Sequence, residues 1–168
     1  MVDASPSTVI EALRRVGGTV AIAESLTGGL VAAALTSVPG ASDVFRGGVV
    51  AYATDLKATL AGVPQDILDR HGPVAGVTAE AMASGVRIAC AATYGLATTG
   101  VAGPDSQDGH RPGTVYVAVA SPDGTRVRSV EPSEEVGDRA AVRRRAVEMA
   151  LALIAGKLDD DERSARES

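Results

Sequence analysis

The most constraining feature of the chain is an apolar run, Val20-Ala21-Ile22, that leads directly into the polar segment Ala23-Glu24-Ser25-Leu26-Thr27-Gly28-Gly29. A glycine pair after a short apolar run predicts a strand that turns sharply into a helix. At such a helix start, free backbone N–H groups and the helix dipole can hold a phosphate or a developing oxyanion, and a nearby hydroxyl can act as ligand or nucleophile. The same glycines also serve ordinary helix packing, so this segment alone leaves a structural role open.

A chain of 168 residues fits one domain that buries a self-sufficient core. We expect a single domain over residues 1–157 and a polar, disordered tail over 158–168, because a run of acidic residues begins at Asp159. No apolar stretch has the length of a membrane span, and the first residues lack the pattern of a signal peptide. The sequence therefore predicts a cytoplasmic protein with no membrane contact.

Composition also narrows the partners. The net charge of -5 and an aromatic content of 2% disfavour nucleic acid, because phosphate contacts need basic surfaces and unpaired bases need stacking platforms. His71 and His110 lie far apart without a cluster of ligands, so we expect no metal site. Cys90 falls in an apolar helical pattern and is typical of a small core residue.

Helical and extended patterns alternate along the chain, with a hairpin near the C-terminus. The turn sequence Ser121-Pro122-Asp123-Gly124 predicts that hairpin. Alternation of this kind predicts an α/β protein whose mixed sheet is covered by helices on both faces. We expect strands near 19–23, 49–52, 96–100, 114–120 and 125–131, and helices near 28–35, 78–92 and 138–155. We also expect a first helix that is capped at Ser5-Pro6 and ends at Gly17-Gly18, and a short helix that is capped by Thr54-Asp55 and carries Lys57.

Three of the predicted strands end in similar polar segments, and side chains at the carboxyl ends of strands in open α/β sheets commonly share one pocket. The segments are Glu24-Ser25-x-Thr27, Tyr52-x-Thr54-Asp55-x-Lys57 and Thr98-Thr99-Gly100. A serine needs a base to become a nucleophile, and a lysine whose pKa is lowered by burial can supply one. Lys57 is the better placed of the two lysines, since Lys157 lies near the C-terminus. A solvated Lys57 is the open alternative, and direct proton transfer requires the two side chains to lie about 3 Å apart.

Two further features bear on anion binding. Arg139, near the start of the last predicted helix, suits a bidentate contact with phosphate, although arginines there also form ordinary solvated faces. The segment Gly100-x-x-Gly103-Pro104 has the composition of a phosphate loop but lacks the Gly-Lys-Ser/Thr ending of a P-loop. Chemistry driven by ATP is therefore disfavoured.

Together, several motifs in order resemble the CinA C-terminal-domain family, whose stand-alone members act as nicotinamide-mononucleotide amidohydrolases. The matching segments are Ala23-Glu24-Ser25-Leu26-Thr27-Gly28-Gly29, Phe45-Arg46-Gly47-Gly48-Val49-Val50-Ala51-Tyr52 with Lys57, Leu60-x-Gly62-Val63, His71-Gly72-x-Val74, Thr99-Gly100-Val101-Ala102-Gly103-Pro104, Gly113-Thr114-Val115 and Gly137-Asp138-Arg139-x-x-Val142-Arg143.

The resemblance implies a three-layer α/β/α sandwich and hydrolysis of the carboxamide of nicotinamide mononucleotide, without a cofactor. It implies Ser25 as nucleophile, Lys57 as general base and Tyr52 as a third catalytic side chain. The substrate-binding residues that we expect are Glu24, Thr27, Gly28, Gly29, Thr99, Gly100, Gly103 and Arg139. The partner would be a small pyridine mononucleotide, and a homodimer is common among such proteins.

The chain departs from the family pattern in three places. Leu26 replaces the usual cysteine, Pro73-Val74-Ala75-Gly76 replaces Ala-Val-Ser-Glu, and the loop 105–112 lacks the usual glycine-rich acidic form. Since the second change removes a hydroxyl and a carboxylate, a catalytically silent module that binds pyridine nucleotides is the alternative function.

Overall fold

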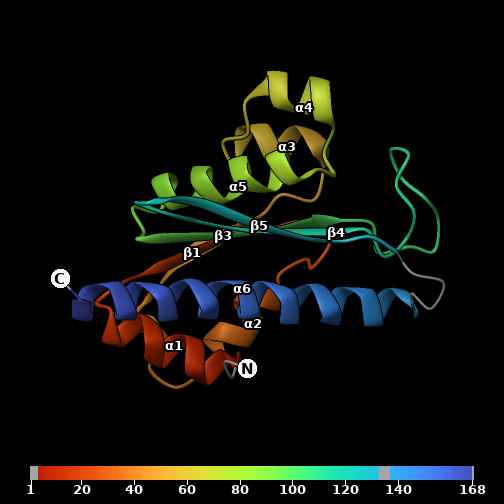
Figure 1. Ribbon diagram of the computed structural model, residues 1–168. Coiled ribbons are helices and arrows are strands. Elements are labelled where there is room, and N and C mark those ends of the chain that lie inside the picture. Colours follow the sequence, from red (N-terminus) through yellow and green to blue (C-terminus); the bar gives the residue numbers. More distant parts are fainter. Residues whose placement is uncertain (1–3, 133–136, 168) are drawn as a thin grey trace.

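The computed structural model describes residues 4–132 and 137–167 and contains a five-stranded mixed sheet between two layers of helices (Figure 1). Its elements are α1 (Pro6–Arg15), β1 (Val20–Glu24), α2 (Leu30–Thr36), the 3-10 turn η1 (Ala41–Asp43), β2 (Phe45–Val50), α3 (Thr54–Thr59), α4 (Gln65–His71), α5 (Gly76–Ala89), β3 (Tyr94–Gly100), β4 (Val115–Ser121), β5 (Gly124–Val130) and α6 (Arg139–Glu167).

The strand order is β2-β1-β3-β4-β5, with β1 parallel to β2 and β3, and β4 antiparallel to both β3 and β5. Helices α3, α4 and α5 cover one face of the sheet, and α1, α2 and α6 cover the other (Figure 1). This arrangement confirms the predicted α/β/α sandwich with a C-terminal hairpin. It also brings the carboxyl ends of β1, β2 and β3 to one edge of the sheet.

The two faces of the sheet carry side chains of different size. Toward α6, the central strands present Ile22, Leu96 and Val117, which belong to the larger hydrophobic core. Toward α5, the same strands present Ala21, Ala97 and their neighbours in a core rich in alanine. Small side chains let α5 lie close to the sheet, which leaves little room at the contacts of this helix.

The C-terminal segment differs from its prediction. The disordered tail expected from residue 158 is wrong for the described residues, because α6 continues to Glu167. Leu158 is fully buried, the Tyr94 hydroxyl donates to Asp161 at 2.7 Å, and Arg15 contacts Glu162 at 2.6 Å. The acidic residues are therefore partners of groups far away in the sequence, and the composition of the run alone does not show this.

Two helices on the other layer also differ from expectation. The sequence patterns missed α4, and α5 begins at Gly76, two positions before the start expected near residue 78. The hydroxyl of Thr78 instead donates to the Gly72 carbonyl at 2.7 Å. In the described ranges, no helix is both long enough and apolar enough to cross a bilayer.

The closeness of α5 to its neighbours predicts opposite effects of alanine at two helical glycines. A Cβ at Gly85 would lie 1.8 Å from the carbonyl oxygen of Ala61, whereas one at Gly156 in α6 would meet nothing within 4 Å. We expect Gly85→Ala to lower the free energy of unfolding by about 1–3 kcal/mol through overpacking. Gly156→Ala should raise it by about 0.5–1 kcal/mol through helix propensity. Urea unfolding of both variants measures this, and a Gly85→Ala protein as stable as wild type would contradict the close packing.

Candidate active site

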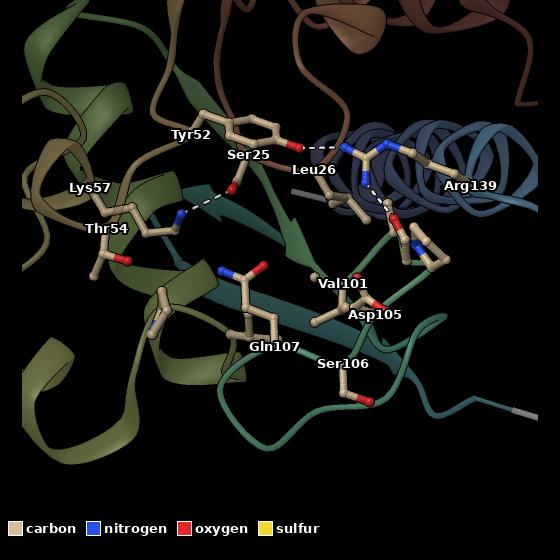
Figure 2. A pocket seen from close by; sticks show the side chains of 16 residues that line it. Ser25, Leu26, Tyr52, Thr54, Lys57, Val101, Asp105, Ser106, Gln107 and Arg139 are labelled. Carbon is tan, nitrogen blue, oxygen red and sulfur yellow. Dashed lines mark hydrogen bonds between the residues drawn. The ribbon is translucent and has the colours of Figure 1, made fainter.

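A cavity of about 290 Å³ opens at the edge of the sheet where β1, β2 and β3 end (Figure 2). Residues of the turn after β1, of the segment between β2 and α3, of α3 itself and of the segment between α4 and α5 surround it, together with the end of β3, the loop after β3 and the first residue of α6. Its lining consists of Ser25, Leu26, Tyr52, Thr54, Lys57, Pro73, Val74, Gly100, Val101, Ala102, Gly103, Pro104, Asp105, Ser106, Gln107 and Arg139.

Ser25 and Lys57 form a hydrogen-bonded pair in this cavity. Ser25 directly follows β1, and its N–H donates to the Thr98 carbonyl of β3 at 3.0 Å, which extends the sheet by one residue. Lys57 lies on α3, and its Nζ donates to Ser25 Oγ at 2.9 Å and to the Ala51 carbonyl at 3.2 Å (Figure 2). The separation satisfies the distance that direct proton transfer between the two side chains requires.

Burial changes the acidity of the Lys57 amine. The residue is only 2% exposed, and both of its hydrogen-bond acceptors are uncharged oxygens. Desolvation therefore lowers the pKa of Lys57 to about 8, against an opposing electrostatic effect of Asp108. A lysine with this pKa is partly neutral near physiological pH and can accept a proton from a hydroxyl.

Tyr52 and Arg139 form another part of the wall. Arg139, the first residue of α6, donates to the Tyr52 hydroxyl and to the Gly103 carbonyl, each at 2.6 Å (Figure 2). Tyr52 is 54% exposed, so this corner of the cavity faces solvent. The guanidinium is held by neutral oxygens and lies at the wall of a polar cavity, a setting that favours an anionic group.

Glu24 has a structural role in place of the predicted contact with substrate. Its buried carboxylate accepts from the backbone N–H groups of Gly29, Val31 and Ala32 at 2.8–3.1 Å. These are N–H groups of the first turn of α2, which have no partner inside the helix. The carboxylate therefore occupies the position at the helix start where the sequence pattern predicted a phosphate or an oxyanion.

Four other predicted contact residues also lie outside the cavity lining. The hydroxyls of Thr27 and Thr98 are 2.7 Å apart in the interior, and Thr99 donates to the Pro73 carbonyl at 2.7 Å. Gly28 and Gly29 have φ angles of +56° and +102°, which form the tight turn into α2. Of the predicted binding residues, Gly100, Gly103 and Arg139 line the cavity together with Ser25, Tyr52 and Lys57.

The sequence patterns did not identify the function of Arg143 or the contribution of the loop after β3. Arg143 donates to the carbonyls of Leu26 and Thr27, each at 3.0 Å, and so fastens the turn after Ser25 to α6. Asp105, Ser106 and Gln107 complete the cavity from the loop. The position of this loop, directly after a strand whose carboxyl end faces the site, was the available signal.

Metal binding has no support in the described ranges, 4–132 and 137–167. No three His, Cys, Asp or Glu side chains in them lie close enough together to hold an ion. The lining of the cavity presents a serine, a lysine of lowered pKa and an arginine, together with the polar side chains of Tyr52, Thr54, Asp105, Ser106 and Gln107.

Fold and site together define an α/β/α sandwich with a buried serine–lysine pair at the carboxyl ends of its parallel strands. The sequence profile of the CinA C-terminal domain matches residues 3–158, and the chain belongs to this family. Both the predicted family and the predicted fold are thereby confirmed.

Relatives of known sequence and structure agree with this assignment. The chain is 50% identical to a CinA-like protein of Frankia casuarinae over 152 residues, and 51% identical to one of Myxococcus xanthus over 142 residues. These alignments cover 90% and 84% of the chain but only 34% and 33% of the relatives, so the chain spans about a third of their length.

Two crystal structures share the fold. A CinA-superfamily protein of Klebsiella pneumoniae superposes with a TM-score of 0.86 at 29% identity, covering 92% of this chain and 96% of that one. The competence/damage inducible protein CihA of Agrobacterium tumefaciens superposes with a TM-score of 0.77 at 34% identity, covering 92% and 98%. The described fold is thus that of a whole chain in each of these structures.

The burial of Lys57 predicts a measurable titration. The chain has two lysines, Lys57 and Lys157, so a protein labelled with ¹³C at lysine Cε gives a spectrum that is simple to assign. We expect the resonance that Lys57→Met removes to titrate near pH 8, because burial lowers the pKa of this amine. A midpoint above pH 10 for that resonance would show that the amine is solvated.

Proposed function

We propose that the protein hydrolyses the carboxamide of nicotinamide mononucleotide to nicotinate mononucleotide and ammonia, with Ser25 as nucleophile and Lys57 as general base. The observation that carries the proposal is the 2.9 Å contact between Ser25 Oγ and the buried amine of Lys57 inside a cavity. The choice of substrate comes from the resemblance to the amidohydrolases of the CinA C-terminal-domain family.

The reaction follows the logic of acyl transfer. Neutral Lys57 takes the hydroxyl proton of Ser25 while Oγ attacks the carboxamide carbon, and the carbonyl oxygen becomes an oxyanion. Lys57 then gives the proton to the amide nitrogen, the C–N bond breaks, and ammonia leaves an ester on Ser25. Water, deprotonated by the same amine, attacks this ester, and collapse of the second oxyanion releases the acid and restores the Ser25 hydroxyl.

The turn after Ser25 offers donors for the oxyanion. Within the described residues, the backbone N–H groups of Leu26 and Thr27 have no acceptor, whereas the N–H of Gly28 donates to the Ser25 carbonyl at 2.9 Å. The N–H of a residue that follows a nucleophile is a common donor to an oxyanion. Arg143 donates to the carbonyls of Leu26 and Thr27, which keeps the turn in place.

Arg139 is the proposed anchor of the substrate phosphate. Its guanidinium lies across the cavity from the Ser25–Lys57 pair (Figure 2). A mononucleotide carries its carboxamide and its phosphate at opposite ends, which matches a cavity with a nucleophile at one wall and a cation at another. The dianionic phosphate would take up the arginine donors that now contact Tyr52 and Gly103.

Ammonia release from nicotinamide mononucleotide tests the reaction. We expect turnover by the wild type and a loss of at least about 10³-fold in Ser25→Ala and in Lys57→Met, because each removes one half of the proton-transfer pair. The value of kcat/KM should rise with pH and level off above about 8, since only the neutral amine of Lys57 accepts a proton.

Ser37→Ala is the matched control, because the Ser37 hydroxyl caps the far end of α2 at the Ala34 carbonyl and should leave turnover unchanged. Turnover by the wild type no greater than that of the two dyad variants would disprove the activity. Calorimetric binding of the same nucleotide would then favour the silent binding module.

The role of Arg139 is tested by comparing substrates with and without phosphate. We expect Arg139→Met to raise KM for nicotinamide mononucleotide by about 10- to 100-fold, the usual effect of losing a charged hydrogen bond. KM for nicotinamide riboside, which has no phosphate, should change less than twofold. Arg144→Met, an exposed arginine on the same helix, is the control. Equal changes for both substrates would instead assign Arg139 to the shape of the wall.

A further inference from the structure

The loop between β3 and β4 contains a short hairpin that two reciprocal backbone hydrogen bonds hold together. Gln107 N–H donates to the His110 carbonyl at 3.0 Å, and His110 N–H donates to the Gln107 carbonyl at 2.8 Å. The two residues between them, Asp108 and Gly109, have φ angles of +50° and +79°, as a tight two-residue turn requires. The backbone of Gln107 is therefore held in place by reciprocal hydrogen bonds.

The base of this loop is also tied to the sheet. Val101 N–H donates to the Thr114 carbonyl at 2.9 Å, and Gly113 N–H donates to the Val101 carbonyl at 2.8 Å. These bonds continue the pairing of β3 with β4 beyond the end of β3 and the start of β4. A side chain carried by the hairpin is thus presented from a defined position, and less entropy is lost when it binds a ligand.

The Gln107 side chain points from this hairpin into the cavity, toward the Ser25–Lys57 pair (Figure 2). Its amide has no hydrogen-bond partner among the described residues, whereas the other glutamine of the chain, Gln65, donates to Asp69 at 2.9 Å. A primary amide offers two N–H donors and one carbonyl acceptor. Gln107 is exposed, so its amide donors and acceptor are open to solvent and to any group that lies beside Ser25.

We propose that Gln107 is a specificity-determining residue that hydrogen-bonds to the carboxamide of the substrate and selects it over the corresponding carboxylate. This inference rests on the proposed function, whose substrate and product differ only in that group. A carboxamide can accept from the Gln107 N–H and donate to the Gln107 carbonyl at the same time. A carboxylate has no donor and leaves the Gln107 carbonyl facing a negative charge.

The nearby electrostatics act in the same direction. Asp108 follows Gln107 in the turn and is close enough to Lys57 to raise the pKa of its amine against the effect of burial. A carboxylate at the reaction position would meet this charge as well. Discrimination against the carboxylate also aids release of the product, because the acid formed on hydrolysis can no longer donate to the Gln107 carbonyl.

Calorimetry in a Ser25→Ala background tests the inference, because that variant lacks the proposed nucleophile and allows binding to be measured without turnover. Measurements at pH 9, above the pKa of Lys57 of about 8, remove the attraction of its ammonium for a carboxylate. We expect nicotinamide mononucleotide to bind at least about fivefold more tightly than nicotinate mononucleotide. Adding Gln107→Leu should lower the ratio of the two affinities to the part that Asp108 supplies, with nicotinate mononucleotide changed less than twofold.

Two variants sharpen the test. Gln107→Glu keeps the shape of the side chain and an acceptor for the carboxamide, so it should weaken binding of nicotinate mononucleotide by about tenfold or more through charge repulsion. Gln65→Leu, the same change at the exposed glutamine of α4, should leave the ratio as it is.

The outcomes separate this inference from the proposed function. A ratio that Gln107→Leu leaves unchanged overturns the role of Gln107, even if the wild type releases ammonia. A ratio that falls in Gln107→Leu supports it, even if no ammonia is released. Failure of Ser25→Ala to bind either nucleotide overturns the inference.

Discussion

The buried amine of Lys57 is the interaction on which the site depends. An ammonium that is taken out of water without a carboxylate partner is unfavourable. The amine of Lys57 donates to neutral oxygens of Ser25 and Ala51, and burial lowers its pKa. Both oxygens come from residues that immediately follow strands, β1 and β2. The end points of these strands and the short helix α3 therefore determine the reactivity of the pair.

The neighbouring residues Glu24 and Ser25 have different partners because their side chains lie on opposite faces of the sheet. Successive side chains of a strand point to opposite faces of the sheet. Glu24 points toward α2 and is fully engaged by its backbone N–H groups, whereas Ser25 points toward α3 and Lys57. A carboxylate on the Lys57 side would favour the ammonium and raise its pKa, which would lower the fraction of neutral amine. One step along the strand thus separates a structural acid from a reactive hydroxyl.

Local sequence patterns predicted the part of the site whose residues directly follow strands or begin a helix. Ser25, Tyr52 and Lys57 follow apolar strands, and Arg139 begins a helix, so their positions near one edge of the sheet were visible in the pattern. Local patterns do not show which face a polar residue takes, and for this reason Glu24, Thr27 and Thr99 were expected in the cavity.

The helical course of residues 158–167 depends on partners such as Tyr94 and Arg15, which are distant in sequence. The hairpin at Gln107 depends on a turn with positive φ at Asp108, which apolar periodicity does not reveal.

Helix α6 holds together the segments that follow β1, β2 and β3 and that form the walls of the cavity. Its first residue, Arg139, bonds to Tyr52 after β2 and to Gly103 after β3, and one turn later Arg143 holds the peptides that follow Ser25 after β1. All three strand ends are therefore fastened to one helix, whose apolar side belongs to the larger core. An anion that draws Arg139 away from Tyr52 leaves the contacts of Arg143 intact, because the two arginines hold different walls. Under the proposed function, a phosphate could thus replace the contact of Arg139 with Tyr52 while the turn after Ser25 stays in place.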